Sequence, residues 1–255
     1  MSDLIVFEQP IHEHIRIYLR LEYLFQQAIY HLHGNSNWDS YACLTTMIEI
    51  LNIFDNLDIK NKLIKELNRY LNLLSRFEKN EYVDNQKLTT LLIEFENIID
   101  SLHSTEGRLG QKLRDNEFIN NFRQYYLLPK GFCGFDAPAI TLWLQQSLTE
   151  RKSHLMDWFK TLENTFLAIN LLLKLLRQSS ESISCIAQNG FYQEMLNSQQ
   201  PCQLLRVTIS KKLNVYPEIS VGRHGLCIRF FLLAINIRGT QIQQDIPFNL
   251  TTCNY

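Results

Sequence analysis

Apolar residues recur with a helical period in the first stretch of the chain, residues 7–32. Pro10 suits the first turn of a helix, where its missing N–H donor costs nothing. Arg16 and Arg20 lie at the centre of the polar arc of the helical wheel. This pattern predicts an amphipathic helix whose polar face is either a solvated surface or an anion-binding one. The opposite, apolar arc consists of Ile11, Ile17, Tyr18, Leu21, Leu24, Phe25, Ala28, Ile29 and Leu32.

The helical pattern continues as far as Glu106, since the chain between Ile11 and that residue has no Pro and only one Gly, Gly34. A turn is predicted around Gly34. Asp58 and Asp84 suit the N-caps of two later helices. Several amphipathic helices joined by short loops predict an antiparallel bundle. The apolar stripes after the first turn contain Tyr41, Leu44, Ile48, Leu51 and Phe54, then Leu63, Leu67, Tyr70, Leu74 and Phe77, then Leu88, Leu91, Phe95, Ile98 and Leu102.

The middle of the chain changes character after the glycines of residues 107–110. A shorter helix is predicted over about 115–126. The segment LPKGFCGFDAP, residues 128–138, is typical of a loop, and we expect it to lead into a strand that ends at Trp143. Ser147 and Glu150 have the spacing of a capping box. They predict the start of the longest helix of the chain, which is expected to continue to about Arg177.

From Ile186 onward the apolar period changes from 3.6 to two. Residues 204–209 alternate, and residues 225–232 form a predicted strand in which Arg229 stands among apolar neighbours. Residues 188–192 and 246–250 predict two more strands, and Leu4-Ile5-Val6-Phe7 can add another. Turns are expected at Pro201, Pro217 and Gly222. The pattern is typical of an antiparallel sheet.

Helices followed by strands predict an α+β protein, made of a helical bundle domain and an antiparallel β domain. The β part is expected to be discontinuous in sequence. We expect the helical domain at residues 11–130 and 147–180. The β-strand domain is expected at residues 1–10, 131–146 and 181–255.

Composition and charge predict an intracellular chain outside the membrane. No apolar run reaches the roughly 18 residues of a membrane span. The segment MSDLIVFEQ lacks the basic region and apolar core of a signal peptide. The six cysteines are therefore expected to be reduced thiols, and their spacings match no zinc pattern. The formal charge is −7 over residues 1–106 and +6 over residues 107–255, which predicts one basic surface rather than a general nucleic-acid binder.

No catalytic, cofactor or metal motif is present in the sequence. A phosphate-binding loop, the zinc-protease motif H-E-x-x-H and the dinucleotide fingerprint are all missing. The pairs His12/His14 and His31/His33 stand two residues apart on a predicted helix, so their side chains point about 200° apart. Asp55 and Asp58 are interpreted as a loop residue and a cap. The sequence thus predicts a protein that is not an enzyme, with no catalytic residue, no cofactor and no metal.

Arginine is the residue type that remains for function. The stretch of residues 108–130 is rich in Arg and Lys, and Arg206, Arg223 and Arg229 lie on or near predicted strands. Apolar flanks indicate that Arg229 points inward or into a pocket, where it needs an anionic partner. This partner is either an acid of the chain, Asp136 or Glu218, or a carboxylate on another protein. Arginine suits bidentate recognition of carboxylates.

Several motifs together resemble the ZapD family of bacterial cell division proteins. They are F-E-Q-P-I-x-E-x-I-R-x-x-L-R-L-E-x-L-x-Q-Q from Phe7, G-R-L-G-Q-x-L-R from Gly107, P-x-G-x-C-x-F-D-x-P from Pro129, then N-G-F-Y-Q and I-R-F. They occur in one register over nearly the whole chain. The resemblance implies a cytoplasmic homodimer with a helical and a β domain. It also implies binding to the C-terminal tail of the ring protein FtsZ and bundling of its filaments at the division site, with no catalytic activity and no cofactor.

The resemblance also implies which residues form the basic site for the FtsZ tail. Carried over by position, they are Arg16, Arg20, Arg114, Arg123, Arg206 and Arg229, with Arg223 as a looser match. The expected partners are FtsZ and a second copy of the chain, with no nucleic acid and no membrane. The alternative is a nucleic-acid or nucleotide-binding regulator that uses the same basic surface. It requires aromatic rings among the arginines, and Tyr125 and Tyr126 beside Arg123 are the one indication of this.

Overall fold

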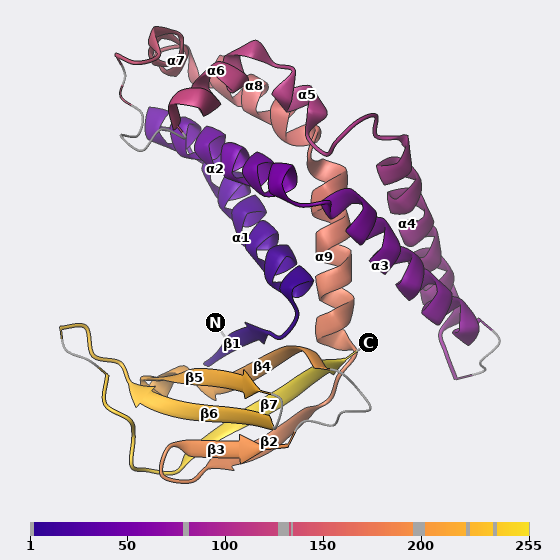
Figure 1. Cartoon of the computed structure of the whole chain (residues 1–255), viewed down its shortest axis with the longest axis vertical. Helices are drawn as coiled ribbons and strands as arrows, with labels where there is room; N and C mark the ends of the chain where they lie inside the picture. The colour runs from indigo at the N-terminus through magenta and orange to yellow at the C-terminus, as the bar shows by residue number, and fades with distance from the viewer. Residues whose placement is uncertain are drawn as a thin grey trace. The chain divides into compact units, whose positions relative to one another are not determined.

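The structure is a computed structural model that describes residues 3–78, 82–126, 133, 135–195, 202–222, 225–236 and 239–254 (Figure 1). It confirms the α+β class, with helices and antiparallel sheets and with one strand far from the others in sequence. The chain divides into two compact units. We call Arg20–Leu172 the helical unit, and Met1–Leu19 with Leu173–Tyr255 the β unit. The domain ranges expected from the sequence stay a prediction.

The helices of the described chain are α1 Glu13–His33, α2 Asn37–Asn56, α3 Ile59–Leu74, α4 Asn85–Ser104, α5 Gln111–Arg114, α6 Glu117–Tyr126, α7 Pro138–Leu144, α8 Leu148–Lys160 and α9 Glu163–Gln178, with 3-10 turns at Ser75–Phe77 and Lys211–Leu213. The strands are β1 Leu4–Pro10, β2 Ser182–Ala187, β3 Phe191–Glu194, β4 Cys202–Ser210, β5 Val215–Gly222, β6 Gly225–Leu232 and β7 Ile246–Asn254. The limits of the two units fall within α1 and α9.

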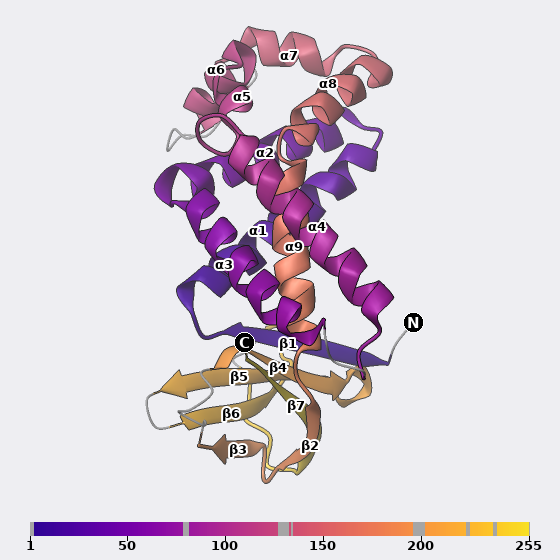
Figure 2. The ribbon, with the colours of Figure 1, turned by 90° about the vertical axis from the view of Figure 1, so that its right-hand side faces the viewer.

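The helical unit is built from amphipathic helices that pack in pairs. α3 and α4 run side by side, which both views show (Figures 1 and 2), and α2 packs against α8. The predicted caps are confirmed, since the Asp58 and Asp84 carboxylates accept backbone N–H groups at the starts of α3 and α4. The core residues of these helices include Leu44, Leu51 and Phe95, each fully buried.

The expected strand before Trp143 is wrong, because residues 138–144 form the helix α7. Pro138 occupies its first turn, where proline is favoured, and Ile140 and Trp143 are buried three residues apart. This spacing places both side chains on one face of a helix, whereas a strand would send them to opposite faces. The preceding residues 127–132 and 134 lie outside the described part of the chain.

The single long helix expected from residue 147 to about Arg177 is also wrong, because it is divided into α8 and α9. The division lies at Thr161 and Leu162. The N–H of Thr161 donates to the Trp158 carbonyl oxygen at 3.1 Å, an i→i−3 bond that tightens the last turn of α8. The Thr161 hydroxyl donates to the same carbonyl oxygen at 2.7 Å. A polar side chain that bonds to its own backbone competes with a continuing helix.

The helix predicted over about residues 115–126 is confirmed as α6, and the single turn α5 comes before it. Asp115 and Asn116 separate the two helices, and the Asn116 side-chain oxygen accepts the N–H of Ile119 at 3.1 Å. An asparagine in this role is a common N-terminal cap. Arg114 therefore belongs to α5 and Arg123 to α6.

Two sheets form the β unit in place of the one that the sequence predicts. Among the described residues, one sheet has the strand order β1-β4-β7-β2 and the other has the order β3-β6-β5, all antiparallel. Side chains from both sheets share one core, in which the Phe230 and Phe248 rings lie 5.3 Å apart. β1 joins β4 across most of the sequence, with Glu8 opposite Arg206.

The capping box at the start of α8 gives a test of this local structure. The Ser147 hydroxyl accepts the Glu150 N–H at 3.3 Å, and the Ser147 N–H donates to the Glu150 carboxylate at 3.0 Å. Ser147→Ala removes one half of this box, so we expect the free energy of unfolding to fall by about 1 kcal/mol. Urea unfolding followed by circular dichroism measures this loss. Ser220→Ala on the exposed side of β5 is the matched control, and an equal loss in both variants would contradict the capping role.

Candidate partner-binding site

One side of α2 carries a line of polar residues at intervals of three positions: Glu49, Asn52 and Asp55. Residues at this spacing lie next to one another on a helix surface. Each of the three contacts an arginine from another helix. We call Glu49, Asn52 and Asp55, together with Arg20, Arg114, Arg123 and Tyr126, the α2 strip. All of them belong to the helical unit.

Asp55 forms the centre of the α2 strip because it holds two guanidinium groups. Arg114 Nε donates to Asp55 Oδ1 at 2.7 Å, and Arg114 Nη2 lies 2.6 Å from the same oxygen. Arg123 donates through Nη2 to the second carboxylate oxygen of Asp55 and through Nε to the Asn52 amide oxygen at 3.1 Å. The side chains of Arg114 and Arg123 are only 13% and 19% exposed. These two arginines are therefore bound within the chain.

The approach of α5 to α2 depends on a glycine. Gly110, which precedes α5, has a φ of +73°. This region favours glycine, and a Cβ atom at Gly110 would also collide with Leu51 of α2. The close approach brings Arg114 within reach of Asp55.

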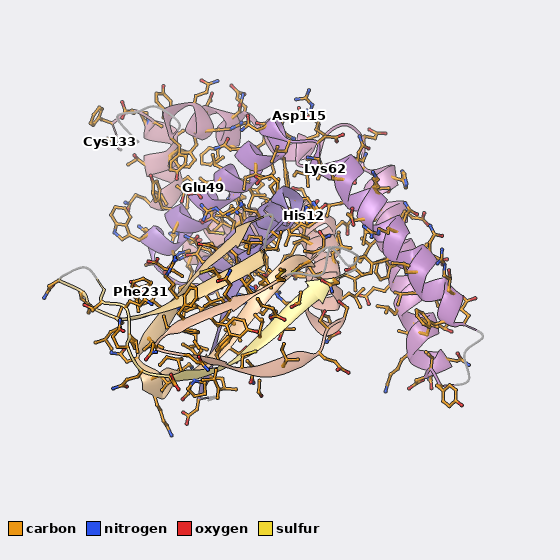
Figure 3. All side chains as sticks on the ribbon, turned by 60° about the horizontal axis from the view of Figure 1, so that its bottom comes forward. His12, Glu49, Lys62, Asp115, Cys133 and Phe231 are labelled. Atoms are coloured by element: carbon orange, nitrogen blue, oxygen red, sulfur yellow. The ribbon has the colours of Figure 1, made fainter. Side chains whose placement is uncertain are left out.

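Glu49, labelled in Figure 3, forms the more open end of the α2 strip, since its side chain is 37% exposed and that of Asp55 is 23% exposed. Its carboxylate accepts Arg20 Nη2 at 3.1 Å and the Tyr126 hydroxyl at 3.2 Å. The Arg20 side chain remains 54% exposed, and its guanidinium carbon lies 5.7 Å from the centre of the Tyr23 ring. Of the three arginines of the strip, Arg20 is therefore the one that solvent reaches most.

Two pKa shifts follow from these contacts. Burial alone would raise the pKa of Asp55, but hydrogen bonds from Arg114 and Arg123 outweigh it, so the pKa lies below its ordinary value. Burial and then the neighbouring Glu49 carboxylate raise the pKa of Tyr126. At neutral pH the strip therefore has an ionised Asp55 and a neutral Tyr126.

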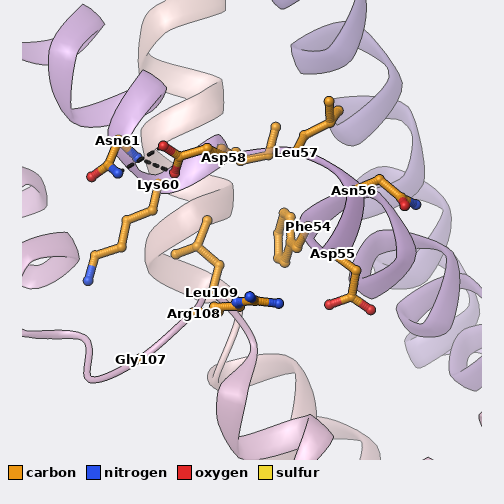
Figure 4. A pocket seen from close by; sticks show the side chains of 11 residues that line it. Phe54, Asp55, Asn56, Leu57, Asp58, Lys60, Asn61, Gly107, Arg108 and Leu109 are labelled. Atoms are coloured by element: carbon orange, nitrogen blue, oxygen red, sulfur yellow. Dashed lines mark hydrogen bonds between the residues drawn. The ribbon is translucent and has the colours of Figure 1, made fainter.

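A hollow of about 520 Å³ lies beside the Asp55 end of the α2 strip (Figure 4). Its lining comes from the end of α2, the start of α3 and residues 107–109. Asp55, Asp58, Lys60 and Arg108 supply its charged side chains. Lys60 Nζ donates to the Thr105 carbonyl oxygen at 2.7 Å, which fixes the lysine at one side. The mixture of acids and bases suits a polar peptide segment better than a single metal ion or an apolar ligand.

The β unit holds two more of the predicted site residues in ion pairs. Arg206 Nε donates to Glu8 at 3.0 Å, and Arg177 binds the same carboxylate with two nitrogens, each at 2.8 Å. Arg16 lies 3.6 Å from Glu13 on α1, and both side chains are more than half exposed. An exposed pair of this kind contributes little to stability. The predicted site residue Arg223 lies outside the described residues.

Arg229 is exposed, so the expectation that it points inward is wrong, and the other expectation, that it faces a pocket, stays a prediction. Along β6, Ile228 and Phe230 are fully buried and Arg229 faces the other way, as the period of two of a strand requires. Its guanidinium carbon lies 5.6 Å from the centre of the Phe191 ring on β3. Glu218 lies directly opposite it in the register of β5 and β6. Apolar neighbours in sequence did not indicate burial here.

The structure thus brings Arg20, Arg114 and Arg123 together on the α2 strip. Arg16, Arg206 and Arg229 belong to the β unit. The sequence analysis missed the acidic partners Glu49 and Asp55. Asp55 was interpreted as a loop residue, but it lies within α2, and that interpretation is wrong. The spacing of Glu49, Asn52 and Asp55 along a predicted helix was the signal that could have revealed the strip.

The described residues contain neither a group of metal ligands nor a membrane-spanning helix. Within these ranges, no three His, Cys, Asp or Glu side chains are grouped so that they could hold a metal ion. Among the helices that the structure describes, none is both long and apolar enough to cross a membrane.

Comparison with known proteins identifies the family. The sequence model of a family described as "ZapD: Cell division protein" matches residues 19–229. A "Cell division protein ZapD" of Coxiella burnetii is 37% identical over 255 residues, which cover 99% of each chain. The protein of the same description from Methylococcus capsulatus is 34% identical over 253 residues, which cover 99% of each chain. That of a Janthinobacterium species is 33% identical over 252 residues, which cover 99% of this chain and 100% of the relative. The chain belongs to the ZapD family of cell division proteins, which confirms the resemblance seen in the motifs.

The shared carboxylate of Asp55 gives a pH-dependent test. Asp55→Asn keeps the shape of the side chain but leaves two guanidinium groups without a counter-charge. We therefore expect a loss of about 2 kcal/mol in the free energy of unfolding at pH 7. The lowered pKa of Asp55 means that its contribution is complete above the ordinary carboxylate range and is lost as the pH falls through the folded pKa. The difference in the free energy of unfolding between wild type and Asp55→Asn should therefore become smaller only below about pH 4.

Urea titrations at several pH values measure this difference. Asp100→Asn on the exposed surface of α4 is the matched control and should change stability by less than about 0.5 kcal/mol. A loss for Asp55→Asn that stays constant from pH 7 to pH 3 would show that the charge of Asp55 does not matter.

Proposed function

We propose that this cell division protein binds the C-terminal tail of FtsZ and bundles FtsZ filaments without catalysing a reaction. The observation that carries the proposal is the α2 strip of a ZapD family member, in which the exposed Arg20 lies in one line of contacts with the mostly buried Arg114 and Arg123. Arginine side chains recognise carboxylates with paired N–H donors. An acidic peptide tail is therefore a suitable ligand for this surface.

The three arginines are proposed to have different roles. Arg114 and Arg123 are mostly buried on Asp55, so we assign them to holding α5 and α6 in place. Arg20 is exposed and donates to Glu49 through one nitrogen, while a guanidinium group has five N–H donors. It is the proposed direct contact for a carboxylate of the tail.

Arg16 and Arg229 of the β unit are proposed as separate contacts, because both side chains are exposed. Arg206 is bound to Glu8, so its proposed role is to support the β unit. Arg223 remains part of the proposed set, although it lies outside the described residues.

Bundling is proposed to follow from a homodimer. A filament displays many tails, so a dimer with two weak sites can connect neighbouring filaments. Two linked sites raise the apparent affinity by about 10²–10⁴ without any new contact. The proposed place of action is the FtsZ ring at the division site in the cytoplasm.

A nucleic-acid or nucleotide-binding regulator is the second candidate function. The observation that favours it is the pairing of exposed arginines with aromatic rings, Arg20 with Tyr23 and Arg229 with Phe191. Stacked bases use surfaces of this kind. Fluorescence anisotropy with a labelled single-stranded oligonucleotide tests it, and binding stronger than that of an FtsZ tail peptide would favour this candidate.

Charge reversal at Arg20 tests the tail-binding proposal. Arg20→Ala removes a contact, whereas Arg20→Glu also adds repulsion, so we expect Arg20→Glu to weaken binding by about tenfold and Arg20→Ala by less. Co-sedimentation with assembled FtsZ, with and without its tail, measures binding. Lys62→Glu on the exposed part of α3 changes the net charge equally and is the matched control (Figure 3).

The same assay with Arg229→Glu tests the contribution of the β unit. If the variant is folded and bundles normally, Arg229 is not a contact. If the wild-type protein co-sediments with FtsZ that lacks its tail as well as it does with intact FtsZ, the proposed function itself is wrong.

The proposed dimer gives a prediction about salt. Raising the ionic strength from 0.1 M to 1 M shortens the Debye length from about 10 Å to about 3 Å, so bundling should weaken. A dimer held by apolar burial should persist, because that burial is not screened. Light scattering should then give about twice the chain mass of 30.1 kDa at both salt concentrations. A monomer at micromolar concentration would exclude the proposed mode of bundling.

A further inference from the structure

Aromatic side chains from three helices meet at the end of the helical unit where α6, α7 and α8 lie together (Figures 1 and 2). The ring of Phe118 lies 5.7 Å from Trp143 and 5.7 Å from Trp158, and the two indole rings are also 5.7 Å apart. The imidazole of His154 is stacked on Trp158, with the ring centres 6.0 Å apart. We call these four residues the aromatic cluster. The proposed function uses none of them.

One hydrogen bond within the aromatic cluster fixes the protonation state of its histidine. The Trp143 indole N–H donates to His154 Nδ1 at 3.2 Å. An indole nitrogen can only donate, so Nδ1 must accept, and an imidazole whose Nδ1 accepts is neutral and carries its proton on Nε2. Protonation would add an N–H at Nδ1, directly against the indole N–H. This contact between α7 and α8 therefore exists only while His154 is uncharged.

α7 depends on contacts of this kind because it has only seven residues. A helix this short is unstable in water by itself. Its buried side chains are Ile140 and Trp143. At its C-terminal end, the Arg151 guanidinium of α8 binds the carbonyl oxygens of Leu144 and Gln146. The indole–imidazole bond is a third attachment, and of these three it is the one that a proton can break.

The positive charge nearest to His154 along α8 opposes its protonation. Arg151 lies three positions before His154 and is only 4% exposed. Besides the two carbonyl oxygens it binds the Ser40 hydroxyl of α2 at 3.0 Å, so all three of these partners are neutral. A second positive charge three positions further along the helix would repel the guanidinium.

The other charged groups around His154 act on it weakly. α7 has no ionisable side chain, and among the described residues that line a hollow of about 390 Å³ beside the cluster, His154 is the only one that ionises. Glu150 and Asp157 lie about one turn before and after it on α8, and Glu117 precedes Phe118 on α6. All three acids are exposed, and the Glu150 carboxylate is already bound in the capping box. Exposed ion pairs contribute little.

We propose that the Trp143–His154 hydrogen bond is a pH-sensitive switch that holds α7 on α8. Histidine is the side chain that changes charge between about pH 5 and pH 8. The bond is complete at the upper end of this range, where the imidazole is neutral, and is lost as the pH falls and the imidazole is protonated. α7 then detaches, and the rings of Phe118 and Trp158 become exposed to solvent. This inference does not depend on the proposed function.

Hydrogen exchange of the backbone amides, followed by mass spectrometry on the full-length protein, tests the switch. The protection factors of α7 are compared at pH 8 and pH 5.5, because a protection factor removes the pH dependence of the chemical exchange itself. α3, which has no histidine, is the internal reference. As the pH is lowered, we expect the protection of α7 to fall about fivefold more than that of α3, which corresponds to the loss of one neutral hydrogen bond.

Two substitutions at His154 separate the hydrogen bond from the stacked ring. His154→Asn places an amide oxygen where Nδ1 was and does not titrate, so α7 should stay protected at both pH values. His154→Phe keeps a ring but has no acceptor, so the protection of α7 should be about fivefold below wild type at pH 8 and should not fall further at pH 5.5. His103→Asn on the exposed side of α4 is the matched control and should behave as wild type.

The inference is wrong if wild-type α7 loses no more protection than α3 between the two pH values. It is also wrong if His154→Asn loses as much as wild type, because the titrating group then lies elsewhere. Wild-type protection of α7 in His154→Phe at pH 8 would overturn it as well, because the bond then does not hold α7. Since His154 is exposed, neither substitution opens a cavity in the core, and circular dichroism at both pH values verifies that each variant is folded.

Discussion

One carboxylate shared by two guanidinium groups holds a large part of the helical unit together. Asp55 on α2 binds Arg114 of α5 and Arg123 of α6, so three helices meet at one side chain. α5 is a single turn and α6 has ten residues, and helices this short are unstable in water without tertiary contacts. Their positions, and with them the position of Tyr126 beside Glu49, depend on this ionic contact. The Asp55 carboxylate must be ionised to hold both guanidinium groups, and its lowered pKa keeps it ionised at neutral pH.

This constraint changes how the arginines of the chain are interpreted. A group of basic residues in a sequence suggests a surface that awaits an anion, but a buried guanidinium group requires a partner within the fold. Arg114, Arg123 and Arg206 have such partners, namely Asp55 and Glu8. Arg20 and Arg229 are exposed and lie against aromatic rings, and Arg20 also donates to Glu49. The difference between a positioning arginine and a contact arginine therefore lies in how far the guanidinium group is buried on its acidic neighbour, and these acids are distant in sequence from the arginines that they bind.

The sequence predicts the local structure well where one signal decides it. The caps at Asp58, Asp84 and Ser147 are where their side chains indicate, and the class of the fold follows from the change of period near Ile186. The errors have physical causes. α7 is short enough that its apolar residues fit either period, and the division between α8 and α9 depends on a hydroxyl–carbonyl bond that no periodicity shows. The partner of Arg114 is 59 residues away in sequence, and only the folded chain reveals it. The outward direction of Arg229, in contrast, could have been predicted from strict alternation along β6.

The pairing of β1 with β4 has a consequence for the order of events during synthesis. β1 is synthesised long before its hydrogen-bonding partner β4 and before the Glu8 contacts Arg177 and Arg206. At typical rates of about 5–20 residues per second, β1 waits for roughly 10–40 s before β4 emerges. The helical unit is continuous in sequence and can form during this interval. Meanwhile Leu4, Ile5 and Val6 form an unpaired apolar segment of the kind that binds chaperones or aggregates, so β1 is open to such contacts until β4 emerges.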